Sequence, residues 1–422
     1  MLRSAALLVL LASCGRVAGF AGAPALRPDR APLPKHCRAA PKVRLAATAS
    51  KADKDEISYT VIPSALKEEG GGWTIKGMAP PPKQGTVWAR ARPKVGEVKK
   101  MGSGSFGTIY LGTDLKTGAE VAVKTEIDFG QDSMLKHEGD MLIQLQGCPG
   151  ISQVYWIGSR ELAGQDQNIM VMDLLGPDME HLLEFLNKRT FTAKTGLMIA
   201  RQMMDCLDAI HSKGILHRDI KPENFLMGVG KNANKVYLVD FGLADWYVDE
   251  SGEHLLESKT DPHDMRGTVR YASVNKHKGI SESRRDDLQE TLYVLVYLMC
   301  GPLPWQSSEL GTMDGLSDSK SGVSRRNQLE LIAQTKEFTS SEDLVARGIG
   351  VPEPVQRLVA EFLDYCKGLE YADCPDYDYL RRRIDEVMKD MKYEFDYNYD
   401  WGNKAPPSVP SGFFKNLLSG AK

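Results

Sequence analysis

The stretch His217-Arg218-Asp219-Ile220-Lys221-Pro222-Glu223-Asn224 decides how this sequence of 422 residues is interpreted. A second run, Asp240-Phe241-Gly242, begins sixteen residues after Asn224. A glycine cluster and a strand-end lysine precede both runs. The order and spacing of these four motifs carry more information than any one of them alone.

The glycine cluster Gly102-Ser103-Gly104-Ser105-Phe106-Gly107 fits the pattern G-x-G-x-x-G. Alone it is weak evidence, because dinucleotide-binding folds and ordinary turns use the same letters. A dinucleotide site requires a helix directly after the glycines, whereas Thr108–Gly112 favours a strand. Two strands hinged on glycines predict a flap whose backbone can close over phosphate groups.

The lysine is Lys124, which ends the predicted strand Glu120–Lys124 and follows Gly107 by seventeen residues. On its own, a lysine at the end of a strand more often carries a solvated surface charge. The later motifs change this interpretation. His217–Asn224 is nearly the full pattern H-R-D-L-x-x-x-N, and Asp240–Gly242 is D-F-G, so the chain resembles a protein kinase.

The resemblance implies an α+β, two-lobed protein kinase fold with a small β-rich N-lobe and a large helical C-lobe. It also implies ATP and Mg²⁺ as cofactors. Asn224 and Asp240 would hold the metal, which neutralises the β- and γ-phosphates. Asp219 would orient the substrate hydroxyl and receive its proton. Lys221 would meet the γ-phosphate, and Lys124 would grip the α- and β-phosphates.

A carboxylate on a nearby helix must hold Lys124, and Glu138 is the best candidate by position. The alternative is an ordinary solvated acid, since other acidic residues lie close to Glu138 in the sequence. His217 has the chemistry of a catalytic base. In this family, however, its counterpart packs and hydrogen-bonds the backbone, so we interpret His217 as structural.

The resemblance also implies where the nucleotide binds. Met172 would lie at the back of the adenine pocket, although core filling is a further reading. The hinge would pair with adenine through the Asp173 carbonyl and the Leu175 N–H. The implied nucleotide contacts are Gly102, Ser103, Gly104, Ser105, Phe106, Gly107, Ile109, Ala122, Lys124, Met172, Asp173, Leu175 and Leu226.

The branch of the family is indicated by a departure from the common pattern. Most protein kinases end the activation segment with Ala-Pro-Glu, but this chain has Ala272-Ser273-Val274-Asn275. This run resembles the casein kinase 1 group, and the likeness extends from about Lys94 to Trp401. Further matching runs are Phe225–Gly228, Ser283–Leu288, Leu303–Gln306, Pro375–Arg381 and Tyr399–Trp401.

Likeness to this group implies a Ser/Thr kinase that favours acidic or already phosphorylated protein substrates. Such a preference requires a basic pocket, and Arg270 matches the anion-contacting arginine of the group. A second basic position falls at or near Gln328, which weakens the inference unless Arg325 or Arg326 substitutes. We therefore expect a reduced preference for acidic substrates.

Other function classes were weighed against this one. A catalytically weak, pseudokinase-type binding scaffold is the main alternative, but Lys124, Asp219, Asn224 and Asp240 are all present. A kinase of small molecules is less favoured, because Asp240–Asn275 has the length of a polypeptide-docking segment. We expect no nucleic-acid partner, no transmembrane segment and a monomer.

Charge is distributed unevenly in the chain. The net charge is −3, yet residues 1–50 hold eight lysines and arginines and one acid. The remaining residues hold 45 basic and 55 acidic side chains, which argues against general nucleic-acid binding.

The basic N-terminal segment has two parts. Residues 1–19 match a signal peptide, because Arg3 precedes a short apolar run and small residues follow it. Residues 20–46 begin with Phe20 and resemble a transit peptide. The pair resembles the presequence of algae with complex plastids, so a plastid location is predicted. A secreted or endomembrane location is the alternative.

We expect the rest of the chain to comprise a linker or extension at 47–93, a kinase domain at 94–401 and a tail at 402–422. The lobes would be 94–175 and 176–401. Apolar spacing from Thr192 onward predicts a helix that Gly214 ends. Leu292–Cys300 is apolar on every face and predicts a helix inside a large core. Gln306–Ser324 is rich in Ser, Gly and Asp and predicts a mobile loop.

Overall fold

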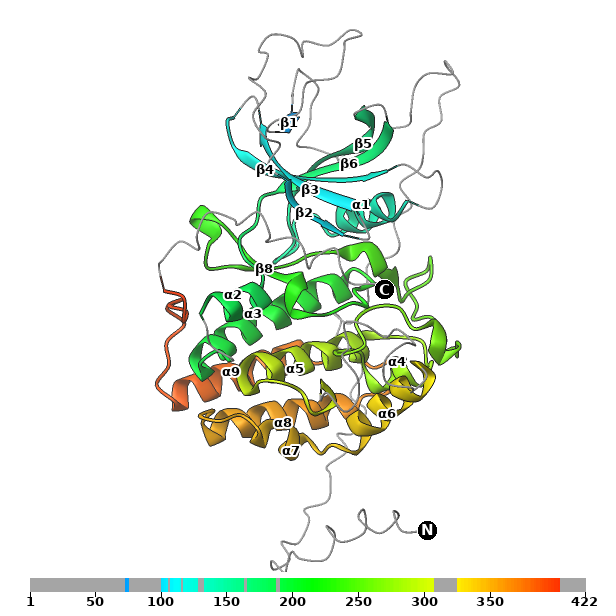
Figure 1. The fold of residues 1–422 in the computed structure, drawn as a ribbon. Helices are drawn as coiled ribbons and strands as arrows, with labels where there is room; N and C mark the ends of the chain where they lie inside the picture. Colours follow the sequence, from blue (N-terminus) through cyan, green and yellow to red (C-terminus); the bar gives the residue numbers. More distant parts are fainter. Residues whose placement is uncertain are drawn as a thin grey trace, which may run out of the picture. The chain divides into compact units, whose positions relative to one another are not determined.

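The computed structural model describes residues 73–75, 100–104, 107–114, 117–127, 133–162, 165–186, 190–306 and 325–402. The chain divides into two units, residues 1–35 and 36–422, and all described residues belong to the second. Strands dominate the first part of this unit and helices the second (Figure 1). The α+β fold class predicted from the sequence is therefore confirmed.

The first part is an antiparallel sheet with the strand order β1-β3-β4-β6-β5, in which β2 also pairs with β3. Its strands are β1 Trp73–Ile75, β2 Lys100–Gly104, β3 Gly107–Asp114, β4 Glu120–Ile127, β5 Val154–Leu162 and β6 Gln165–Asp173. Side chains alternate along β4, so Val121 and Val123 pack in a small cluster on one face. Ala122 belongs to the main core on the opposite face, and Lys124 lies on that side by the same alternation.

Helix α1 (Met134–Gln144) packs against β5 and β6, and its first turn is fixed by two side chains. Ser133 caps the helix by accepting a hydrogen bond from the Lys136 N–H at 3.1 Å. The carboxylate of Glu126 accepts hydrogen bonds from the N–H groups of Met134 and Leu135. A negative charge there also interacts favourably with the helix dipole. Glu138 is consequently held on the buried face of α1.

The second part contains eight helices among the described residues, and short strands connect some of them. The helices are α2 Met179–Phe185, α3 Ala193–Ser212, α4 Val274–His277, α5 Arg284–Cys300, α6 Arg325–Phe338, α7 Ser341–Ala346, α8 Glu353–Lys367 and α9 Tyr377–Asp390. The strands are β7 Ile215–Leu216, β8 Phe225–Met227, β9 Val236–Leu238 and β10 Asp245–Trp246; β7 pairs with β10, and β8 with β9. None of the helices in the described part of the chain has the length and apolarity needed to cross a bilayer.

Helices α3 and α5 form the centre of the core, as their sequences predict. Thr192 caps α3, and Gly214 follows its end with φ +84°. Most of α5 is buried, and Leu292 has no exposed surface. The two helices approach closely at Gly196, where an added Cβ would lie 2.3 Å from the sulfur of Met299.

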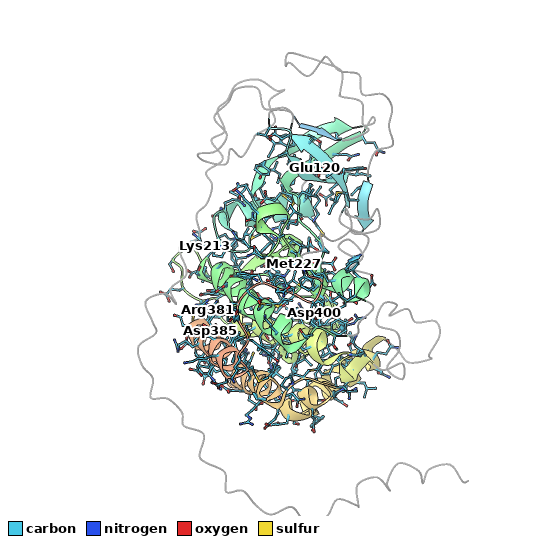
Figure 2. All side chains as sticks on the ribbon, turned by 90° about the vertical axis from the view of Figure 1, so that its left-hand side faces the viewer. Glu120, Lys213, Met227, Arg381, Asp385 and Asp400 are labelled. Atoms are coloured by element: carbon cyan, nitrogen blue, oxygen red, sulfur yellow. The ribbon has the colours of Figure 1, made fainter. Side chains whose placement is uncertain are left out.

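The last described segment, around Trp401, packs on the beginning of α3. Asp400, labelled in Figure 2, accepts hydrogen bonds from the Thr192 N–H and hydroxyl, both at 2.7 Å, and from the Thr195 hydroxyl. The Trp401 ring stacks on Tyr399 and meets Phe191 edge-on, with centroids 5.5 Å apart. This segment therefore supplies part of the C-terminal core and a second cap for α3.

Two further expectations from the sequence concern the loop 306–324 and the extension 47–93. Residues 307–324 of the expected loop lie outside the described residues, as do residues 1–72 and 403–422. The predicted extension 47–93 contains strand β1, which the sequence did not indicate. Trp73–Ile75 pairs with Gly112–Asp114 of β3, so this part of the extension adds a strand to the sheet.

Replacing Trp401 by alanine is expected to lower the free energy of unfolding by about 3–5 kcal/mol, since a large buried ring is lost. Urea unfolding monitored by circular dichroism measures the effect. Phe338→Ala is the matched control, because the Phe338 side chain is 83% exposed. Equal unfolding midpoints for the two variants would show that the last segment adds nothing to the core.

Candidate active site

The loop after α3 carries the first group of predicted site residues. It follows β7 and is anchored by Asp287 of the buried helix α5, which accepts hydrogen bonds from the His217 N–H at 2.7 Å and the Arg218 N–H at 2.9 Å. His211 contacts the same carboxylate. The His217 ring is fully buried, contacts the Val239 carbonyl at 2.9 Å and packs edge-on against a phenylalanine, Phe241. His217 thus has the packing and backbone contact of a structural residue.

Asp219 is buried, and both of its carboxylate oxygens have partners. Oδ2 pairs with the Lys221 ammonium at 2.7 Å. Oδ1 accepts hydrogen bonds from the Thr268 N–H and hydroxyl, both at 2.8 Å. Burial alone would raise the pKa of Asp219, but Lys221 and the Thr268 hydroxyl hold it below its ordinary value. The carboxylate is therefore ionised and held in one orientation at neutral pH.

Lys124 is almost fully buried and lies between two carboxylates. Its ammonium is 2.6 Å from Glu138 of α1 and 3.5 Å from Asp240, which follows β9. Burial alone would lower the pKa of Lys124, but Glu138 and Asp240 raise it above its ordinary value. Strand β4, the helix α1 that follows it and the distant turn after β9 therefore meet at one protonated lysine.

Asn224 and Asp240 have the donor chemistry of a site for a divalent metal. The Asn224 side-chain nitrogen donates to the Asp219 carbonyl at 2.8 Å, while its buried side-chain oxygen Oδ1 has no hydrogen-bond partner. A buried acceptor left without a donor is costly, and an oxygen-seeking cation would satisfy it. Asp240 is held at φ +67°, a conformation that L residues adopt rarely. The two oxygen donors therefore fit a metal whose other ligands are phosphates and waters.

The glycine cluster lies at the turn between β2 and β3, where Gly104 is paired with Gly107. Gly107 has φ +123°, and an added Cβ would lie 2.0 Å from the carbonyl oxygen of Thr125. Only glycine fits there, so the turn can lie close to β4, the strand of Lys124. Ser105 and Phe106 lie outside the described residues, and no side-chain position is described for Ser103.

The predicted adenine pocket residues fall in the main apolar core. These residues, Ile109, Ala122, Met172, Leu175 and Leu226, are at most 9% exposed. Ala122 is paired with Met172 across β4 and β6, so their side chains lie on the same face of the sheet. The Asp173 side chain accepts hydrogen bonds from the Tyr155 hydroxyl and the Gln153 N–H, which fixes the start of the hinge.

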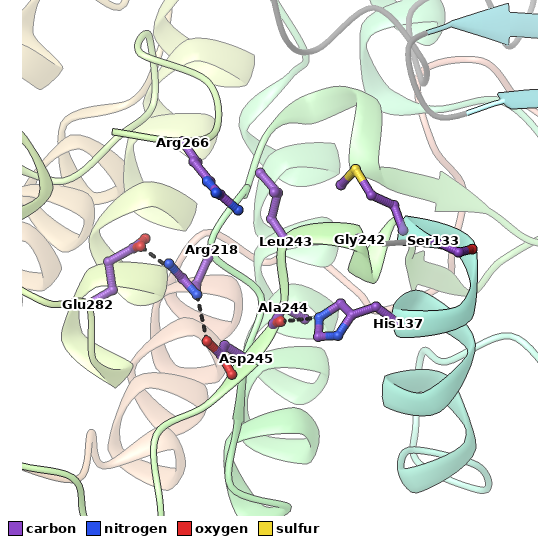
Figure 3. A pocket seen from close by; sticks show the side chains of 10 residues that line it. Ser133, His137, Arg218, Gly242, Leu243, Ala244, Asp245, Arg266 and Glu282 are labelled. Carbon is purple, nitrogen blue, oxygen red and sulfur yellow. Dashed lines mark hydrogen bonds and ion pairs between the residues drawn. The ribbon is translucent and has the colours of Figure 1, made fainter. Parts of the chain in front are cut away.

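A cavity of about 370 Å³ lies between α1 and the segment after Asp240 (Figure 3). On one side, His137 of α1 contacts the Ala244 carbonyl at 2.8 Å. On the other side, the Arg218 guanidinium pairs with Asp245 and Glu282, both at 3.0 Å. The cavity is separate from the Lys124 cluster and includes none of the predicted nucleotide contacts.

Arg270 lies on the turn Val269–Ala272 before α4. Lys336 of α6 donates to the Val269 and Ala272 carbonyls at 2.8 and 2.7 Å. The Trp305 indole donates to the Arg270 carbonyl at 2.7 Å. Arg270 is half-buried and interacts electrostatically with Glu180 of α2. The backbone of this turn is therefore held from the α6 side.

Sequence reasoning missed two side chains at the site. Thr268 contacts Asp219 directly, and Lys276 of α4 contacts the catalytic loop at the Arg218 carbonyl. Neither contact had a signal in the local sequence, because the partners are 49 and 58 positions apart. A motif search limited to the loop therefore finds the carboxylate and overlooks what orients it.

The structure brings the Asp219 carboxylate, the buried ion pair of Lys124 with Glu138, and the side-chain oxygens of two further residues to one region. These two residues are Asn224 and Asp240. A comparison with known families agrees with this arrangement: the family model described as a protein kinase domain matches residues 95–367, more than half of the chain. This domain implies the use of ATP and a divalent metal, and protein as the substrate. The chain belongs to the protein kinase family.

Proposed function

We propose that this chain is a serine/threonine protein kinase of the casein kinase 1 group, which uses Mg²⁺ and transfers the γ-phosphate of ATP. The observation that carries the proposal is the Asp219 carboxylate, which is ionised and held by Lys221 and Thr268. The fixed carboxylate in this loop favours catalysis over the binding-scaffold alternative. The intact ion pair between Lys124 and Glu138 favours it as well.

In the proposed reaction, the substrate hydroxyl oxygen forms a bond to the γ-phosphorus while the bond from that phosphorus to the β-bridging oxygen breaks. Asp219 orients the hydroxyl and accepts its proton, and ADP leaves with the bridging oxygen. Lys221, already beside Asp219, meets the negative charge of the γ-phosphate. Mg²⁺, held by Asn224 and Asp240 when bound, neutralises the β- and γ-phosphates.

Lys124 binds the α- and β-phosphates in this proposal, and Glu138 keeps its ammonium in place. The pair is buried, so removing either partner leaves a charge without compensation. Because Glu138 is part of α1, the position of that helix sets the position of the lysine. His137, one residue earlier, contacts the Ala244 carbonyl and supports the same position of α1.

The preference for acidic or phosphorylated substrates is part of the proposal and rests on Arg270. Its turn is anchored through three carbonyls by Lys336 and Trp305, which favours a defined direction for the guanidinium. Glu180 partly offsets the charge of Arg270, and Gln328 supplies no cation. We therefore propose a reduced preference, carried mainly by one arginine.

Asp219→Asn is expected to lower kcat by about 10²- to 10⁴-fold, because the amide cannot accept the hydroxyl proton. The affinity for ATP is retained, since Lys124 and the metal-binding oxygens are unchanged. Radiolabelled phosphate transfer to casein measures kcat, and a fluorescent ATP analogue measures binding. Asp390→Asn, an exposed site on α9, is the control. Full activity of the Asp219 variant would exclude Asp219 as the base.

Arg270→Ala is expected to raise KM for a peptide with phosphoserine upstream of the target by about 10- to 100-fold. KM for ATP stays unchanged, because Arg270 takes no part in the proposed ATP contacts. Steady-state kinetics with paired phosphorylated and unphosphorylated peptides measure the difference. Arg347→Ala, at an exposed position after α7, is the control. If the wild type gains no rate from upstream phosphoserine, the substrate preference is wrong while the kinase assignment stands.

We also propose that residues 1–46 direct the protein to a complex plastid, with secretion or an endomembrane location as the alternative. The basic, acid-poor composition of this segment supports a transit peptide after a signal peptide. Residues 1–50 fused to a fluorescent protein should accumulate in the plastid of an alga that has one. Fluorescence confined to the endoplasmic reticulum or the medium would favour the alternative. A fusion of residues 1–19 alone is the control, and it should enter the secretory system only.

A further inference from the structure

Lys276 of α4 is a buried lysine beside the catalytic loop, and no motif assigned it a role. Its ammonium donates to the Arg218 carbonyl oxygen at 2.5 Å and pairs with Glu282 at 2.7 Å and Glu290 at 3.5 Å. Burial alone would lower the pKa of Lys276, but the two carboxylates raise it. The ammonium therefore remains charged at neutral pH, and its partners are one backbone carbonyl and two acids.

The carbonyl that Lys276 binds belongs to a strained residue. Arg218 has φ +69°, a conformation that L residues keep only when the surrounding structure holds them in it. Asp287 binds the N–H of Arg218 and Lys276 binds its carbonyl. Glu282 closes a ring, because one of its oxygens pairs with the Lys276 ammonium and the other with the Arg218 guanidinium. Figure 3 shows the pair between Glu282 and Arg218. The backbone of Arg218, the residue before Asp219, is thus held at its N–H and at its carbonyl.

The other side of Asp219 is tied to the same cluster. Glu290 of α5 pairs with Lys276 and accepts hydrogen bonds from the Ile220 N–H at 3.3 Å and the Ser273 N–H at 3.4 Å. Ile220 directly follows Asp219 in the loop. The Lys276–Glu290 pair therefore contacts the backbone on both flanks of the proposed base.

Gly267 leaves the space in which these groups meet. An added Cβ at this position would lie 3.0 Å from the Arg218 carbonyl oxygen, 3.1 Å from the Lys276 nitrogen and 3.2 Å from Asp219 Oδ1. Its φ of +91° also favours glycine. These three atoms all lie around the position that a Cβ of residue 267 would occupy. The Lys276 ammonium is therefore a close neighbour of the Asp219 carboxylate.

We propose that Lys276 is a positioning residue for phosphoryl transfer, which directs the Asp219 carboxylate by holding the peptide groups on either side of it. The proposal rests on the kinase function proposed above. Lys276 acts through Arg218 and Glu290 and makes no contact with ATP in this assignment. A small displacement of the base lowers the rate of transfer because the reaction depends on close alignment of the reacting groups.

The test compares Lys276→Met, Lys276→Gln and Lys276→Arg in the full chain, with casein as the substrate. Methionine removes both the charge and the donor, glutamine keeps a donor, and arginine keeps both. We expect kcat per folded molecule to fall by about 10- to 100-fold for methionine, with KM for ATP changed less than about twofold. The kcat of the glutamine variant should lie between those of the methionine and arginine variants. The arginine variant should retain most of the wild-type kcat.

The matched control is Lys278→Met, since Lys278 is exposed and pairs only with Glu337 in the described structure. Lys276→Gln keeps the proposal testable if the methionine variant does not fold, because it retains a donor for the Arg218 carbonyl. An unchanged kcat in a folded Met or Gln variant, or a parallel rise in KM for ATP, would overturn the proposal. An inactive wild type would instead refute the kinase function itself.

Discussion

The protonated Lys124 between Glu138 and Asp240 is the interaction on which the rest of the site depends. It joins strand β4, helix α1 and the turn after β9 through one buried ammonium. A buried ion pair of this kind contributes little net stability, because the desolvation of its charges offsets their attraction. Its value lies in alignment. The Ser133 cap and the Glu126 carboxylate at the start of α1, and the Asp173 contacts at the hinge, all support the same alignment.

Two strained backbone positions lie beside the reactive groups. Arg218 and Asp240 are two of the four non-glycine residues with positive φ in the described part of the chain. Each lies in a segment held by buried carboxylates or by a lysine, and each places a functional group where an extended backbone would not. Residues in such conformations cost of order 1–3 kcal/mol, which the surrounding contacts must offset. The large core around α3 and α5 supplies part of that stability, and α5 also carries Asp287 and Glu290, which hold the catalytic loop.

Local patterns in the sequence predicted much of this fold. The apolar spacing of α3, the all-round apolar surface of α5 and the glycine-hinged strands are signals carried by neighbouring residues, and the structure has these elements. The residues proposed for the site were found from motifs, and their roles remain predictions. The contacts of Thr268 and Lys276 were not predictable, because their partners are 49 and 58 positions away in the sequence. Strand β1 pairs with a distant strand, and its flanking glycines and prolines indicate only a linker.

Lys336 departs from the general expectation that a lysine is solvated, since it lies among backbone carbonyls and the Tyr293 and Trp305 rings.

The cap that Asp400 provides for Thr192 has a consequence for the order in which the molecule assembles. The two residues are 208 positions apart, so the beginning of α3 emerges from the ribosome long before its partner exists. At a synthesis rate of about 5–20 residues per second, this interval lasts about 10–40 s. During that time Phe191 lacks its contact with Trp401, so the apolar surface around it is exposed in the nascent chain. Exposed apolar surface of this kind is what chaperones bind. The beginning of α3 is thus completed by a segment that is made 208 residues later.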